Sequence, residues 1–346
     1  MEGKETLMSV RVAINGFGRV GRCAFRSAYE SGAPIEWVGI NDIADPATLA
    51  HLLRHDTVYG PFPGPIEAEE DALVVDGVRI PVYSETDPAE LPWATVGAEV
   101  VLECTGKFRT REDAAKHLQA GARKVIVSAP GKGVDATIVR GVNEAMYDPE
   151  LHDVISNASC TTNCLAPVAK VLQETFGIRH GTMTTVHAVT GDQRVVDLPH
   201  KDLRRARAAG ANIVPTTTGA AKAIGLVIPE LDGKLHGFAA RVPVLTGSLV
   251  DLTVELETET TAEEINAAFQ RAGETELAGI LQLSFEPLVS SDVIKSTYSS
   301  VVDGSLTNVV GGTQAKVVAW YDNEWGYATR LQELAQRALA GVPVAA

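Results

Sequence analysis

The feature that most constrains the fold is a glycine-rich turn between a short apolar strand and a helix near the N-terminus. Residues 10–14 form an apolar segment typical of a strand, Gly16, Gly18 and Gly21 follow in G-x-G-x-x-G spacing, and a helical pattern continues toward Tyr29. The first glycine allows a tight turn, the second lets the backbone approach a pyrophosphate, and the third lets helix and strand pack closely. In this context the turn predicts a dinucleotide-binding unit.

An acidic residue follows where such a unit binds the cofactor ribose. A second apolar strand, residues 37–40, ends in Asn41 and Asp42, about 20 residues after the glycines, where the ribose-binding acid belongs. A carboxylate there repels a 2′-phosphate, so Asp42 favours NAD over NADP. The alternative is that Asp42 caps the next helix, which begins near Asp45.

The rest of the first half continues the α/β alternation. Residues 100–103 and 125–128 are apolar strands, residues 111–120 form a helix between them, and residues 72–80 predict a hairpin on an Asp-Gly turn. The pattern predicts an α/β Rossmann-type, doubly wound parallel sheet with an antiparallel excursion.

In the second half the pattern changes to strands, at residues 182–189, 239–245 and 249–256. They predict an α+β domain with a mixed or mostly antiparallel sheet. The intervening stretch, residues 190–212, is a long loop of the kind that is usually functional, and a helix is expected over residues 217–225. The last helical pattern, with Leu331, Leu334, Ala335, Ala338 and Leu339 on one face, is expected to pack back on the first domain.

One cysteine lies where a thiol can be activated. A short strand runs into a hydroxyl-rich helix start, with Ser159 as the N-cap and Cys160 in the first turn. Unpaired amides at a helix N-terminus, or a histidine such as His187, lower a thiol pKa, and His187 can serve as general base. The alternative is that Cys160 is a small buried hydrophobe. Cys164 is expected to pack in the core, and no second Cys/His pair completes a metal site.

Composition limits the classes of function. The 346 residues carry a net charge of −14, which argues against a general nucleic-acid or membrane-surface binder. Four cysteines without an even-spaced framework indicate reduced thiols, and residues 1–9 contain no signal-peptide core, so a cytoplasmic location is expected. Whether residues 1–7 belong to the native chain stays open. A cationic cluster, His200, Lys201, Arg204, Arg205 and Arg207, is either a local phosphate site or a solvated or subunit-contacting loop.

Taken together, seven runs resemble the phosphorylating glyceraldehyde-3-phosphate dehydrogenase family across nearly the whole chain. They are residues 14–19, 156–164, 187–193, 200–207, 215–222, 241–243 and 320–327. The resemblance implies NAD-dependent oxidation of D-glyceraldehyde 3-phosphate to 1,3-bisphosphoglycerate, a step of glycolysis and gluconeogenesis. Cys160 would be the nucleophile that carries a thioester, and His187 the base. The family pattern implies an NAD-binding domain (1–158), a catalytic domain (159–322) and a C-terminal helix segment (323–346).

The same resemblance implies binding residues and partners. NAD would contact Gly16, Phe17, Gly18, Arg19, Val20, Asp42, Ser128 and Asn323, with Asn323 orienting the nicotinamide amide. Thr190 and Arg241 would bind the substrate phosphate, whereas Ser159, Thr161, Arg204, Thr218 and Gly219 would bind the attacking inorganic phosphate. A homotetramer is implied, without membrane or nucleic acid as the main partner. The alternatives are an erythrose-4-phosphate dehydrogenase on the same scaffold and a non-catalytic NAD-binding redox sensor.

Overall fold

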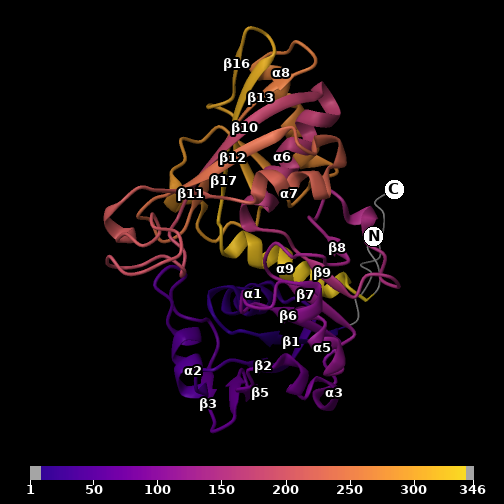
Figure 1. Ribbon diagram of the computed structural model, residues 1–346, viewed down its shortest axis with the longest axis vertical. Helices are drawn as coiled ribbons and strands as arrows, with labels where there is room; N and C mark the ends of the chain where they lie inside the picture. Colours follow the sequence, from indigo (N-terminus) through magenta and orange to yellow (C-terminus); the bar gives the residue numbers. More distant parts are fainter. Residues whose placement is uncertain (1–8, 340–346) are drawn as a thin grey trace.

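The computed structural model describes residues 9–339, which fold around two β-sheets (Figure 1). The first sheet comprises β1 (Val10–Asn15), β2 (Ile35–Asn41), β3 (Ile66–Ala68), β4 (Ala72–Val75), β5 (Val78–Tyr83), β6 (Val100–Glu103), β7 (Lys124–Val127), β8 (Ala136–Thr137) and β9 (Val154–Ser156). Its strand order is β3-β4-β5-β2-β1-β6-β7-β9-β8. From β5 to β8 all neighbours run parallel. The predicted doubly wound parallel sheet is therefore confirmed.

The antiparallel excursion is the predicted hairpin. Strands β3, β4 and β5 pair antiparallel, and β4 turns into β5 at Asp76 and Gly77. Both residues have left-handed φ angles, 53° and 79°, as a two-residue hairpin turn with the twist of its strands requires.

The helices of this half are α1 (Arg19–Ser31), α2 (Pro46–Arg54), α3 (Trp93–Val96), α4 (Arg111–Ala114) and α5 (Lys116–Gln119). The single helix predicted over residues 111–120 is thus two short helices. They are separated at Ala115, where the Leu118 N–H bonds to the Ala115 carbonyl three residues back, a tighter turn than an α-helix makes.

The second sheet comprises β10 (Ile178–His187), β11 (Val214–Thr217), β12 (Leu235–Arg241), β13 (Ser248–Leu256), β14 (Leu281–Ser284), β15 (Ser300–Asp303), β16 (Asn308–Val310) and β17 (Gln314–Tyr321). Its order is β11-β12-β10-β13-β17-β15-β14, with β16 on β17. Within the described part of the chain, only the β10–β12 and β14–β15 pairs of this sheet are parallel. This sheet is mostly antiparallel, as predicted, and α6 (Cys160–Phe176), α7 (Ala220–Val227) and α8 (Ala262–Glu274) pack with it in one core.

Three predicted elements in this half have other bounds. The strand expected over 182–189 is β10, which begins four residues earlier, at Ile178, and ends two residues earlier, at His187. The strand expected over 239–245 is β12, which begins four residues earlier and ends before Pro243, whose ring removes a ladder donor. The helix expected from Thr217 begins at Ala220, because the β-branched Thr216 and Thr217 extend β11 against β12.

The last described helix, α9 (Trp325–Arg337), returns to the first sheet after β17 has completed the second. Figure 1 shows it in yellow beside the indigo α1. Ser27 on α1 and Thr329 on α9 share a hydrogen bond of 3.0 Å, and Trp325 and Leu331 belong to the core cluster of the first sheet. The segment just before α9 therefore lies between the two sheets. Within residues 9–339, no helix is both long and apolar enough to cross a membrane.

Candidate active site

Cys160 is the first residue of α6, just beyond the end of β9 in the first sheet. Ser159 caps the helix as predicted, since its hydroxyl accepts a hydrogen bond of 3.0 Å from the Thr162 N–H. The preceding Ala158 has a φ of 54°, unusual for a residue with a Cβ. Its carbonyl accepts a bond of 3.2 Å from the Tyr327 hydroxyl on α9, which helps to hold this conformation. The sharp entry fixes where the thiol lies.

His187 ends β10 and brings its ring to the thiol. The Cys160 Sγ lies 3.4 Å from His187 Nε2, within hydrogen-bond distance for sulfur. Arg241 is the register partner of His187 on the parallel neighbour β12, so its guanidinium reaches the same ring. The structure thus joins the three residues that the sequence placed on separate elements.

The two contacts of His187 Nδ1 require opposite tautomers. Nδ1 lies 2.7 Å from the Ala188 carbonyl oxygen, which needs an N–H, and 2.5 Å from Arg241 Nη1, which needs a lone pair. Arg241 Nη1 has the same carbonyl as another acceptor, at 3.2 Å. We assign the proton to Nδ1, where it donates to the Ala188 carbonyl and leaves the Nε2 lone pair for the Cys160 thiol; the Arg241 contact with Nδ1 is then not a hydrogen bond, and Arg241 Nη1 donates to the Ala188 carbonyl instead.

Burial decides the charge of this pair. It raises the pKa of the Cys160 thiol, and the smaller opposing effects of Arg241 and Thr161 do not reverse the direction. The sequence had predicted a lowered thiol pKa from the helix start. Burial, then the charge of Arg241, lowers the pKa of His187 to about 3. These directions leave a thiol beside a neutral imidazole at neutral pH, and a proton passes from sulfur to nitrogen only against that difference in pKa.

The Arg241 guanidinium has one N–H donor, Nε, that no residue of the described chain accepts from. Its Nε is buried and has no hydrogen-bond partner among residues 9–339, and a buried unpaired donor calls for an acceptor that is not part of the chain. Thr190, its predicted partner in phosphate binding, donates from Oγ1 to Asp192, whose carboxylate lies 2.6 Å from Arg205. The charge of Arg241 helps to lower the pKa of Asp192. Thr190 and Arg241 themselves make no direct hydrogen bond.

The five residues predicted to bind the attacking phosphate do not all line one hollow. Arg204, Thr218 and Gly219 line one hollow of about 990 Å³, together with Lys222, a residue not predicted for the site. Ser159 and Thr161 lie instead at the start of α6, where Thr161 Oγ1 bonds to the Tyr321 hydroxyl at 3.0 Å.

Tyr321, at the end of β17, was missed from the sequence. Its hydroxyl lies 3.0 Å from both Thr161 Oγ1 and Thr185 Oγ1, and its ring meets the His187 ring edge-on at 6.0 Å between centroids. It thereby ties the start of α6 to the strand that carries His187. No sequence signal distinguishes it, since Tyr321 is an ordinary inward-facing strand residue until the strand neighbours are known.

The glycine-rich turn has the shape that a dinucleotide needs. Gly16 has a φ of 93°, and a Cβ there would come within 2.7 Å of the Thr105 nitrogen. A Cβ on Gly21 would come within 2.3 Å of the Gly16 oxygen, which confirms its role in close packing. Gly18 faces open space and caps α1 without a side-chain bond, so the first amides of α1 are available to an anion.

Asp42 lies beside this turn, as predicted. Its Oδ2 accepts a bond of 2.7 Å from the Phe17 N–H, and with Gly16 and Gly18 it lines a hollow of about 230 Å³. Its other oxygen accepts from the Ala44 N–H, so Asp42 shapes the turn after β2 as well. It does not cap α2, since Asp45 does so by accepting from Thr48. These residues fit a bound NAD.

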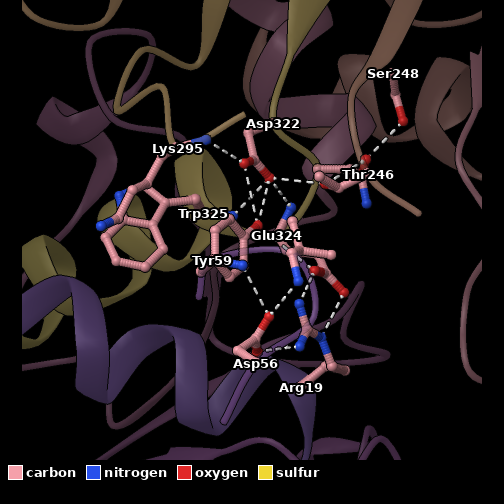
Figure 2. A network of polar contacts seen from close by, with 11 residues as sticks. Arg19, Asp56, Tyr59, Thr246, Ser248, Lys295, Asp322, Glu324 and Trp325 are labelled. Atoms are coloured by element: carbon pink, nitrogen blue, oxygen red, sulfur yellow. Dashed lines mark hydrogen bonds and ion pairs between the residues drawn. The ribbon is translucent and has the colours of Figure 1, made fainter. Parts of the chain in front are cut away.

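Three other predicted cofactor residues, Arg19, Val20 and Ser128, are engaged in contacts within the chain. Val20 packs against the core of the first sheet, and the Ser128 N–H at the end of β7 bonds to the Glu103 carbonyl. The Arg19 guanidinium is held by two carboxylates, Asp56 and Glu324, as Figure 2 shows. Arg19 can therefore offer a cofactor mainly its backbone amide, at the first position of α1.

Asn323, the residue predicted to orient the nicotinamide, follows β17 between the two sheets. Its Oδ1 accepts a bond of 2.8 Å from Ser248 Oγ and lies 3.3 Å from Thr246 Oγ1. The neighbouring Asp322 accepts from the hydroxyls of Tyr59 and Thr246 and from the Lys295 N–H (Figure 2). These bonds come from elements of both sheets and fix the backbone on which Asn323 stands.

Among residues 9–339, no group of three or more His, Cys, Asp or Glu side chains could hold a metal ion. Cys164, one turn after Cys160, is fully buried in the core of the second sheet, as predicted.

Comparison with known proteins agrees with this geometry. Residues 10–111 match the family described as "Glyceraldehyde 3-phosphate dehydrogenase, NAD binding domain", and residues 159–323 match its C-terminal domain. The glyceraldehyde-3-phosphate dehydrogenase of Geobacillus stearothermophilus is 58% identical over 328 residues, covering 95% of this chain and 98% of its own. That of Streptomyces coelicolor is 56% identical over 94% and 98%. Glyceraldehyde-3-phosphate dehydrogenase 2 of Bacillus subtilis is 54% identical over 96% and 98%.

Proposed function

The chain belongs to the glyceraldehyde-3-phosphate dehydrogenase family, and we propose that it oxidises and phosphorylates glyceraldehyde 3-phosphate through a thioester on Cys160. It is an NAD-dependent enzyme, as both the relatives and the NAD-binding domain show. The observation that carries the proposed mechanism is the 3.4 Å contact between Cys160 Sγ and His187 Nε2, with the unpaired Arg241 Nε close by. Each group has a separate part in the reaction.

In the first step Cys160 Sγ bonds to the aldehyde carbon while its proton passes to His187 Nε2. The Nδ1–H of His187 donates to the Ala188 carbonyl throughout, which holds the ring and stabilises the charge it acquires. The carbonyl oxygen of the substrate becomes the hydroxyl of a hemithioacetal when the imidazolium returns the proton. No separate thiolate is needed in the resting enzyme.

The hydride acceptor comes from the cofactor. NAD, when bound, accepts the hydride that turns the hemithioacetal into a thioester. The residues that would hold it are Gly16, Phe17 and Gly18 in the turn, Asp42 toward the ribose, and Arg19, Val20, Ser128 and Asn323 around them. His187 takes the hydroxyl proton of the hemithioacetal as the carbon loses its hydride.

In the last step inorganic phosphate cleaves the thioester. An oxygen of inorganic phosphate bonds to the thioester carbon, the C–S bond breaks, and His187 returns a proton to the departing sulfur. Arg241 with Thr190 would hold the substrate phosphate. The attacking phosphate would be drawn by the hollow of Arg204, Thr218 and Gly219 and would meet Ser159 and Thr161 at the start of α6 when it reaches the thioester. An anion beside Arg241 also counters the guanidinium charge that lowers the pKa of His187, so the bound substrate makes His187 a stronger base.

Assembly and location are part of the proposal. Loop 190–212 exposes Val195, Val196, Leu198 and Leu203, large apolar side chains of the kind that subunit contacts cover. We assign the chain to a homotetramer in which this loop meets a neighbouring subunit. The absence of a cysteine framework supports a cytoplasmic location.

The test is an NADH absorbance assay with glyceraldehyde 3-phosphate, run with and without phosphate and with NADP in place of NAD. Sustained turnover is expected only with NAD and phosphate together. Cys160→Ser should abolish it, whereas Cys164→Ala, one helical turn away in the core, should retain it. A higher kcat/KM for erythrose 4-phosphate would favour the alternative substrate, and NAD binding without any aldehyde-dependent NADH would favour the redox sensor.

A further inference from the structure

Ser248, a residue with no assigned role, links Ala188, the neighbour of the proposed base His187, to Asn323 at the proposed nicotinamide site. It begins β13 and is 1% exposed. Its Oγ accepts a bond of 3.0 Å from the Ala188 N–H and donates one of 2.8 Å to Asn323 Oδ1. Ala188 is the residue whose carbonyl holds His187 Nδ1. One hydroxyl therefore lies between the peptide that fixes the base and the side chain that would orient the cofactor.

Counting protons shows which end of the Asn323 carboxamide this hydroxyl selects. A serine hydroxyl has one proton, and a backbone N–H can only donate, so the bond with Ala188 leaves the Ser248 proton for another acceptor. Among residues 9–339 the acceptor within reach is Asn323, which must therefore present its oxygen to Ser248. This assignment removes the usual ambiguity between the oxygen and nitrogen of an amide.

The nitrogen end of Asn323 is left for a ligand. No residue between 9 and 339 accepts a hydrogen bond from Asn323 Nδ2, although the residue is only 7% exposed. Thr246 Oγ1, also buried, lies 3.3 Å from Oδ1, but its one proton goes to Asp322 Oδ1 at 3.0 Å, so the orientation rests on Ser248. With its oxygen bound to Ser248, Asn323 thus offers two N–H donors, which suit the carbonyl oxygen of a carboxamide.

The strand register explains why Ser248 occupies this place. Ser248 pairs with Tyr321 on β17, two residues before Asn323, while the next residue, Leu249, pairs with Val186 on β10. The start of β13 therefore lies between the ends of the strands that carry His187 and Asn323. At this place the Ser248 hydroxyl supplies both the acceptor for the Ala188 N–H and the donor for Asn323.

We propose that Ser248 is a positioning residue. By binding Asn323 Oδ1 it turns Asn323 Nδ2 toward the nicotinamide carboxamide, and by accepting from the Ala188 N–H it fixes the place of the Asn323 side chain relative to His187. The inference rests on the proposed function, in which Asn323 contacts the nicotinamide. Ser248 acts through Asn323 and touches neither substrate nor cofactor. Its loss leaves the Asn323 carboxamide free to rotate, so the nicotinamide loses its orientation while the adenosine half of NAD keeps its contacts.

Calorimetric titration of the full-length enzyme with NAD and with ADP-ribose, which lacks the nicotinamide, separates this role from a general structural one. Ser248→Ala should weaken NAD binding about fivefold, the effect of one ordinary hydrogen bond, and leave ADP-ribose binding unchanged. Ser299→Ala is the matched control, because Ser299 is also buried, at 4% exposure, but its hydroxyl has no partner among residues 9–339. It should change neither affinity.

Asn323→Ala completes the test. Alone it should weaken NAD but not ADP-ribose, and adding Ser248→Ala should then have no further effect on NAD binding. With deuterated substrate, Ser248→Ala should place deuterium on both faces of the nicotinamide ring, whereas the wild-type enzyme uses one. Equal weakening of NAD and ADP-ribose, or a Ser248→Ala effect that persists without Asn323, overturns the inference. If Asn323→Ala alone changes nothing, the assigned role of Asn323 fails, and the fault lies in the proposed function.

Discussion

The buried neutral state of His187 makes the stability of the fold sensitive to acid. The folded pKa of about 3 lies below the ordinary value of 6.5. Between these values the unfolded chain binds a proton at position 187 that the folded chain does not. The contribution of His187 to stability is therefore fully present above pH 6.5 and is lost as the pH falls toward 3.

The magnitude follows from linkage. Between pH 7 and pH 5 the unfolded histidine becomes protonated almost completely and the folded one hardly at all, so His187 should cost about 2 kcal/mol of unfolding free energy over this range. The value depends little on the folded pKa once that pKa is well below 5. His187→Asn removes the titrating group and should remove this part of the pH dependence.

The assay is urea unfolding of the cofactor-free enzyme at a series of pH values, for the wild type and for His187→Asn. His180→Asn, on an exposed position of the same strand, is the control and should follow the wild type. Absolute stability will differ between variants, so the comparison concerns only the change with pH. If wild type and His187→Asn lose the same free energy between pH 7 and 5, the imidazole is not held neutral and the reasoning fails.

Three further substitutions test separate parts of the site. Tyr321→Phe leaves the buried hydroxyls of Thr161 and Thr185 without their shared partner and should cost about 2 kcal/mol in urea unfolding; a loss below the experimental error would contradict the network. Asp42→Asn keeps an acceptor for the Phe17 amide but removes the charge that repels a 2′-phosphate. The ratio of kcat/KM for NAD to kcat/KM for NADP should therefore fall about tenfold. An unchanged ratio would show that the carboxylate does not select the cofactor. Arg241→Lys removes the planar guanidinium with its unpaired Nε and should raise the KM for glyceraldehyde 3-phosphate about tenfold or more, while unaltered steady-state kinetics would place the phosphate elsewhere.

The sequence predicted those parts of the molecule that local physics determines. Gly16 and Gly21 have the conformation or close contacts that their spacing implied, and Asp76 and Gly77 form the expected turn. Ser159 caps α6 because capping depends only on neighbouring residues. The sequence offered His187 as a base for Cys160, and the resemblance paired the two, but they lie 27 positions apart and only the fold brings their side chains together.

Other parts of the site depend on strand register, which the sequence does not reveal. Tyr321 and Ser248 are buried strand residues whose hydroxyls acquire partners only when β10, β13 and β17 lie side by side. The expected lowering of the Cys160 pKa was wrong for a related reason: the amides of the helix start are local, but the burial that raises the pKa depends on how the fold surrounds the thiol.

The most direct test of the central claim is a single-turnover experiment without phosphate. Rapid mixing of the enzyme with NAD and glyceraldehyde 3-phosphate should give a burst of one NADH per active site, after which turnover stalls. Mass spectrometry of the trapped enzyme should find the acyl group on Cys160, and added phosphate should release it. A burst that survives in Cys160→Ser, or an acyl group on another residue, would contradict the assignment of Cys160 as the covalent carrier between oxidation and phosphorolysis.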